Sequence, residues 1–129
     1  MCTKVYALAQ HAAHRWIGVC DHQAIHLAWD CMFLFLRPCD LHKLANTLSA
    51  TRCELDSPAE GPVLYEIWIG NCALQLMRAD YLSLRSLVWE AVARLPEEIP
   101  MATSTVPMRI AEKYEREETP FMNVWFSTN

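Results

Sequence analysis

The sequence repeats itself at an interval of forty residues, and this repeat limits the folds that the chain can adopt. When the sequence is shifted by forty positions, residues 25–48 lie over residues 65–88. Identical residues then coincide at four positions: Leu34 with Leu74, Leu36 with Leu76, Asp40 with Asp80, and Leu44 with Leu84. Each copy has the pattern of two strands, a tight turn between them and a helix after them. We therefore expect a fold built from two hairpin-helix units.

Two-residue turns would fix how the strands of each hairpin pair. Gly70-Asn71 is typical of a primed hairpin turn, because glycine readily adopts the positive φ that such turns require. Asp30-Cys31 occupies the matching position in the first copy, and aspartate tolerates the same conformation. The resulting register gives each hairpin one fully apolar side: Ile25, Leu27, Trp29, Met32, Leu34 and Leu36 in the first, and Tyr65, Ile67, Ile69, Cys72, Leu74 and Leu76 in the second. A slip of one residue would destroy both patterns, so we expect these leucines to be buried.

Helical periodicity follows each hairpin directly. Two apolar stripes follow from this periodicity: Leu41, Leu44, Ala45 and Leu48 in the first copy, and Tyr81, Leu84, Val88, Ala91, Val92 and Leu95 in the second, which ends before Pro96. We predict a single α+β domain over residues 1–129. It would contain a largely antiparallel sheet made by the two hairpin-helix repeats, with both helices on one face of the sheet.

The residues outside the repeat complete the predicted domain. Strands are expected at Lys4–Gln10 and Arg15–Val19, which with the first hairpin give a meander of four strands. Met108–Glu118 has the pattern of a short helix. Residues 96–129 form a C-terminal extension, and its end, Phe121–Phe126, is apolar. We expect this extension to be docked on the body of the protein or on another chain.

The composition narrows the class of protein. The chain is 53% hydrophobic and 20% charged, with a net charge of −4, which suggests a buried interface in addition to a core. Because no basic patch stands out, nucleic acid is not expected as the main partner. No apolar run reaches the ~18 residues of a membrane span, and the N-terminus lacks the apolar segment of a signal peptide. We therefore expect a cytoplasmic location and reduced cysteines.

Cysteine and histidine residues in the first part of the chain predict a possible zinc site. A strand over Arg15–Val19 would span roughly 16 Å at ~3.3 Å per residue, so histidines before it cannot share an ion with residues after it. The predicted threading brings a different set to one end of the meander: Cys2, Cys20, His22 and His26, with Cys39 as a further candidate. Mixed Cys and His ligands favour zinc. The alternative is that the cysteines are small buried apolar residues and the two histidines are surface groups.

A further pattern combines Met1-Cys2, Cys20, His26, the hairpin-helix at residues 25–48, and Ile99-Pro100-Met101. In this combination the chain resembles an uncharacterised family of small bacterial proteins. That family begins with Met-Cys, has a Cys-x-x-Cys run just before a His-bearing strand, and has a similar Ile-Pro-Ile segment. Here Gln23 stands in place of the second cysteine of the run. The resemblance implies a similar hairpin-helix and brings no known activity with it.

One pair of residues fits nucleophilic catalysis. Cys39 and His42 have helical i,i+3 spacing, Asp40 is adjacent, and a cysteine near a helix N-terminus would have a lowered pKa. Pairs of this kind also arise by chance, and the chain has only three glycines and no glycine-rich phosphate loop. An enzyme is therefore the third hypothesis, with no assigned catalytic residue.

The register that buries the leucines also turns large aromatic side chains outward. Phe33, Phe35 and Trp68 fall on the outward side of the two hairpins. A sheet with helices on one side should present a mostly polar face to water, so either the C-terminal tail or another protein should cover these residues. The leading hypothesis is a small cytoplasmic binding or accessory protein that acts through protein contacts, with a partner protein or a homo-oligomer. The alternative is a zinc-stabilised or metal-sensing domain.

Overall fold

The computed structural model describes residues 4–51, 64–100 and 102–114, and within them the chain is of the α+β class, as predicted. The elements in chain order are β1 (Val5–Ala12), β2 (Arg15–Cys20), β3 (Ile25–Trp29), β4 (Met32–Leu36), α1 (Pro38–Ala50), β5 (Leu64–Ile69), β6 (Cys72–Met77), α2 (Arg78–Ala93) and β7 (Met108–Lys113). The four-strand meander followed by a helix is confirmed. None of the helices in these ranges is long and apolar enough to cross a membrane.

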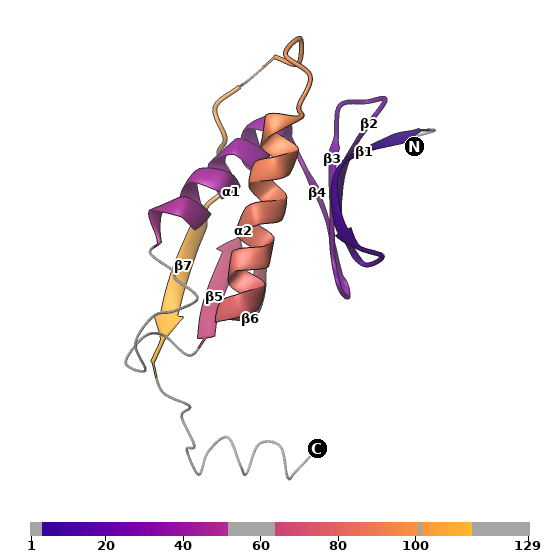
Figure 1. Ribbon diagram of the computed structural model, residues 1–129. Helices are drawn as coiled ribbons and strands as arrows, with labels where there is room; N and C mark the ends of the chain where they lie inside the picture. Colours follow the sequence, from indigo (N-terminus) through magenta and orange to yellow (C-terminus); the bar gives the residue numbers. More distant parts are fainter. Residues whose placement is uncertain (1–3, 52–63, 101, 115–129) are drawn as a thin grey trace, which may run out of the picture.

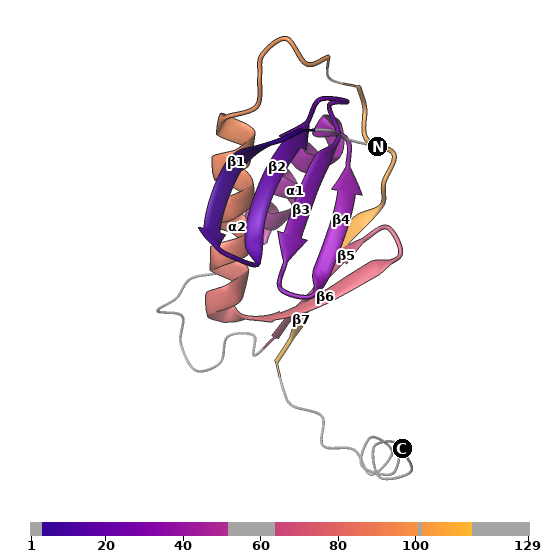
Figure 2. The same ribbon diagram turned by 90° about the vertical axis from the view of Figure 1, so that its right-hand side faces the viewer.

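The strands form two antiparallel sheets, so the prediction of a single sheet is wrong. One sheet has the order β1-β2-β3-β4, and the other has the order β6-β5-β7. The two helices lie between the sheets as a middle layer (Figures 1 and 2). Each sheet therefore has both helices on one face. The two hairpins pack their apolar sides against the helices as parts of separate sheets, and their edge strands β4 and β6 approach each other without pairing.

The predicted hairpin register is confirmed in both copies. Leu27 pairs with Leu34 in the first hairpin, and Ile67 pairs with Leu74 in the second. The first residue of each turn has a positive φ, 54° at Asp30 and 59° at Gly70. These matching turns set matching registers, as primed hairpin turns do.

Burial of the four repeated leucines is less uniform than predicted. Leu36 and Leu76 are buried, whereas Leu34 and Leu74 are only half-buried against the core. All four lie on edge strands, and in each strand the buried leucine is the one nearer to the helix that follows. Residues of both hairpins line a groove of about 470 Å³, in which Met32 Sδ lies 3.6 Å from Cys72 Sγ.

The helix layer is buried on two sides because a sheet covers each side. In α2, Leu84, Leu87 and Val88 are all fully buried, although Leu87 lies outside the apolar stripe that the sequence indicated. Tyr81 connects the two helices, since its hydroxyl donates to the carbonyl oxygen of Leu48 at 2.6 Å. A one-sided stripe is the expectation for a surface helix, and this helix is internal.

The prediction of a short helix over residues 108–118 is wrong in its described part. Residues 108–113 form β7, which pairs with β5 so that Ile110 faces Ile67. The edge of β5 opposite β6 needs hydrogen-bond partners, and β7 supplies them. This tertiary requirement outweighs the weak helical pattern. The rest of that segment and the apolar tail at residues 121–126 lie outside the described residues.

Candidate functional site

The outer face of the four-stranded sheet carries two uncharged rows of side chains. Strand pairing aligns the residues of each row across the sheet: Gln10, Trp16, Ala28 and Phe33 in the first, and Ala7, Gly18, His26 and Phe35 in the second. All eight point away from the helices, because side chains alternate along a strand and the opposite positions form the core. This face is turned to the viewer in Figure 2. Exposure of an apolar sheet face of this kind to water is unfavourable.

Four rings form a packed cluster on this face. The aromatic cluster consists of Trp16, His26, Phe33 and Phe35, with Phe33 and Phe35 at a centroid distance of 5.2 Å and His26 and Phe35 at 4.8 Å. The contacts are edge-to-face, which is a favoured geometry for aromatic pairs. His26 is 6% exposed beneath its neighbours, whereas Phe33 is 48% and Phe35 is 66% exposed. The two phenylalanines therefore offer fixed rings to the outside.

Gly18 allows this face to be filled by its neighbours. A Cβ atom at this position would lie 2.7 Å from Val5 Cγ1 and 3.3 Å from Trp16 Cζ3. The missing side chain thus leaves room for Val5 and Trp16 to lie over the centre of the sheet. The aromatic cluster continues in this way across β2 toward β1, which the hairpin register alone could not indicate.

Trp68 does not belong to this surface, contrary to the expectation of one shared aromatic face. It lies on the outer face of the other sheet, where its indole donates to Glu66 at 2.8 Å and Arg109 lies 4.9 Å from its ring. Glu66 also accepts a hydrogen bond from Gln75. Hydrogen bonds from Gln75 and Trp68 lower the pKa of Glu66. Polar neighbours thus surround Trp68, as expected for a face turned to water.

The structure brings together only part of the predicted zinc ligand set. Cys20 and His22 lie close together, and Asp21 completes a group whose ligand atoms are all within 4.8 Å of one another. His26 instead belongs to the aromatic cluster, and Cys39 lies at the start of α1. Cys2 is outside the described residues. Asp21 was not among the predicted ligands, because the predicted set contained only Cys and His side chains.

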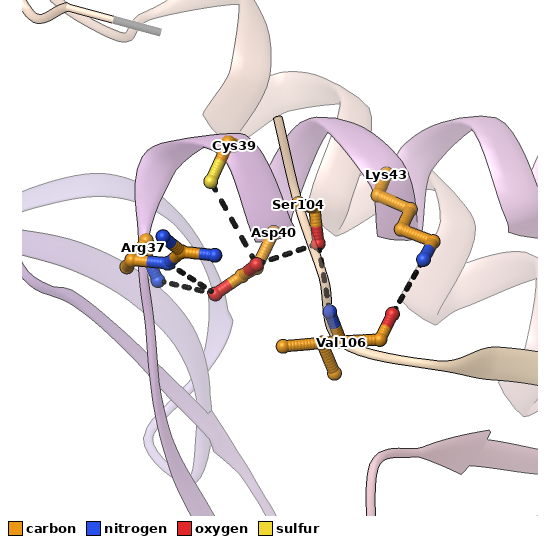
Figure 3. A network of polar contacts seen from close by, with 6 residues as sticks. All are labelled: Arg37, Cys39, Asp40, Lys43, Ser104 and Val106. Carbon is orange, nitrogen blue, oxygen red and sulfur yellow. Dashed lines mark hydrogen bonds and ion pairs between the residues drawn. The ribbon is translucent and has the colours of Figure 1, made fainter. Parts of the chain in front are cut away.

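Cys39 and His42 line one open cavity of about 550 Å³ between α1 and residues 102–104. Figure 3 shows the contacts at its rim, where the Cys39 thiol points at Asp40, with Sγ 3.7 Å from Oδ1. Asp40 also accepts hydrogen bonds from Ser104 Oγ at 2.7 Å and from the backbone N–H of Arg37 at 2.9 Å. This arrangement is therefore better suited to holding α1 against residues 104–106 than to activating a nucleophile.

Asp40 should make stability depend on acid pH. Burial alone would raise its pKa, but hydrogen bonds from Ser104 and Arg37 outweigh burial and hold the pKa below the ordinary 3.8. A carboxyl with a lowered folded-state pKa stabilises the protein above its unfolded pKa, and this stabilisation is lost as the pH falls through the folded pKa. We expect the difference in unfolding free energy between wild type and Asp40→Asn to be constant down to about pH 5 and to shrink below about pH 4. Urea unfolding of both proteins across this pH range measures the difference. A difference in unfolding free energy that grows as the pH falls would contradict this role of Asp40.

Comparison of the chain with family models, with curated proteins and with solved structures gives no match. Function must therefore be inferred from the arrangement of the residues themselves. The aromatic cluster is the most extensive feature that the core does not explain, because it joins three strands and leaves Phe33 48% and Phe35 66% exposed.

Proposed function

We propose that this protein is a binding or accessory protein that acts through protein contacts, with the outer face of the four-stranded sheet as the interface. The observation that carries the proposal is the aromatic cluster at the β4 end of two uncharged rows. Full burial of a phenylalanine is worth roughly 1.5–3 kcal/mol relative to exposure. Burial of Phe33 and Phe35 by a partner would therefore contribute a substantial part of the binding free energy.

The geometry of the cluster suits recognition because its rings are already fixed. Side chains that must be ordered on binding cost about 0.5–1.5 kcal/mol each. Phe33 and Phe35 pack against each other and against His26 before any partner arrives, so this cost is reduced. Aromatic residues at the centre of an interface typically contribute most of its binding energy.

We infer that the occupant of this face is a second copy of the chain. The net charge of −4 makes two copies repel each other, and a contact through eight uncharged positions avoids placing like charges together. A two-fold dimer also needs a patch that complements itself, and a sheet face with edge-to-face rings meets that requirement. The C-terminal tail is the competing cover. The described chain leaves β7, which belongs to the opposite sheet, so the tail would have to pass around the helix layer.

Phe35→Ser and Phe33→Ser are expected to convert a dimer into a monomer, because each removes one of the two exposed rings that the second copy would cover. Light scattering combined with size-exclusion chromatography measures the mass. Trp68→Ser is the matched control, since it changes an aromatic residue on the polar face of the other sheet, and it should leave the mass unchanged.

Removal of the residues after Thr119 distinguishes the two possible covers of this face, a second copy of the chain and the C-terminal tail. If a second copy covers the face, the shortened chain remains a dimer with unchanged stability. If the wild-type chain is a monomer and the shortened chain becomes unstable and self-associates, the tail is the cover and the dimer is wrong. A stable monomer in both forms contradicts the proposed interface.

A further inference from the structure

The turn between β2 and β3 holds three potential metal ligands on three consecutive residues. The donor atoms of Cys20, Asp21 and His22 all lie within 4.8 Å of one another. Within the described ranges, this is the one such group of three cysteine, histidine or acidic residues. The set offers one sulfur, one nitrogen and one oxygen, and it lies outside the aromatic cluster proposed to bind protein.

The distances fit a tetrahedral zinc ion after small movements of exposed side chains. Zinc lies about 2.3 Å from sulfur and about 2.0–2.2 Å from nitrogen or oxygen, so ligands at tetrahedral angles are roughly 3.4–3.6 Å apart. His22 Nδ1 and Asp21 Oδ1 are already 3.6 Å apart. Cys20 is buried, whereas the other two side chains are exposed and can rotate toward its sulfur.

The backbone of the turn is held in place before any ion binds. Cys20 donates to the carbonyl of Ala24 at 3.0 Å and accepts from the N–H of Gln23 at 2.9 Å. Asp21 donates to the carbonyl of Lys4 at 3.2 Å, which ties the turn to the start of β1. Gln23 has a φ of 63°, a conformation that the surrounding hydrogen bonds maintain. A fixed backbone lowers the cost of bringing three ligands together.

We propose that Cys20, Asp21 and His22 form a binding site for a zinc-class divalent ion, with the fourth position open to water. The mixed sulfur, nitrogen and oxygen donors select borderline-soft ions such as zinc or cobalt over magnesium and calcium, which take oxygen ligands. On binding, the Cys20 thiol releases its proton to solvent and coordinates as the thiolate. Three protein ligands and one open position are typical of zinc sites that accept a further ligand.

The test uses the full chain, reduced and freed of metal, and titrates it with cobalt(II). Wild type should bind one cobalt ion per chain and develop the near-ultraviolet charge-transfer band of a cobalt–thiolate bond, and zinc should displace the cobalt. Asp21→Asn and His22→Ala should each weaken binding at least about 100-fold, the upper end of what loss of a supporting outer partner costs. Both positions are exposed, so these variants keep the fold. Cys20→Ser should abolish the charge-transfer band.

Two control variants remove a cysteine and a histidine at other positions of the four-stranded sheet. Cys31→Ser removes an exposed thiol from the turn between β3 and β4, and His14→Ala removes a histidine from the turn between β1 and β2. Neither should alter the affinity or the spectrum. Absence of the charge-transfer band in wild type overturns the proposal. Cobalt affinity that is unchanged in both Asp21→Asn and His22→Ala overturns it equally.

Discussion

Asp40→Ala is expected to lower the free energy of unfolding by about 3 kcal/mol, because hydrogen bonds to a buried charged group are worth about 1.5–3 kcal/mol each. The Asp40 carboxylate is 3% exposed and accepts hydrogen bonds from Ser104 Oγ and from the backbone N–H of Arg37. Alanine would leave the Arg37 N–H at the helix start and the Ser104 hydroxyl without this acceptor. Urea or thermal unfolding of the two proteins at neutral pH measures the loss.

The repeat supplies a matched control for this variant at the equivalent position. Asp80 lies in the first turn of α2 as Asp40 lies in the first turn of α1. Its side chain is 43% exposed and pairs with Arg15 at 3.1 Å. Exposed ion pairs are worth up to about 1 kcal/mol, so Asp80→Ala should cost much less. Equal losses for the two variants would mean that the contacts of Asp40 with Ser104 and Arg37 add no stability of their own.

The hairpin register could be predicted because it depends on local chemistry. A positive φ at Asp30 and at Gly70 fixes a two-residue turn, and the turn determines every pair along the two strands. Phe33 and Phe35 follow from this register as outward residues. The two exposed members of the aromatic cluster could therefore be predicted from the sequence.

The arrangement of the two sheets could not be predicted, because it depends on contacts between distant segments. Full burial of Leu87 shows that α2 is covered on two sides, and a one-sided stripe gives no sign of this. The separation of Trp68 from Phe33 follows from the same layering. The position of β7 depends on the open edge of β5, which outweighs the local helical pattern of residues 108–118.

Trp16 is the member of the aromatic cluster that the sequence did not indicate. Trp16 meets Phe33 because β2 pairs with β3 in a register that aligns Trp16 with Ala28. No tight turn fixes that register, since four residues connect β2 to β3. The same four-residue connection contains Asp21, whose position beside Cys20 depends on the fold of the turn. Longer connections leave pairing to tertiary contacts, and local patterns then lose their predictive power.

Alanine in place of Leu36 or Leu76 is expected to cost about 2–5 kcal/mol, the range for a fully buried leucine. Both side chains face the helix layer and are buried. Leu34→Ala and Leu74→Ala should cost less, about 1–2 kcal/mol, because these side chains are only half-buried and lose less contact area. Chemical unfolding of the four variants measures the loss of unfolding free energy in each and therefore their ranking.

The repeat makes this comparison stringent, because each buried leucine has a half-buried neighbour two residues away in the same strand. The two members of each pair share strand, hairpin and side-chain chemistry, so the difference between them isolates burial. We expect the same ranking in both hairpins, since the two copies share one register and one burial pattern. Equal costs for Leu34 and Leu36 would mean that Leu34 is buried as fully as Leu36. A small cost for both leucines of one hairpin would mean that its strands pair one residue out of the observed register, because such a slip turns both side chains to the outer face.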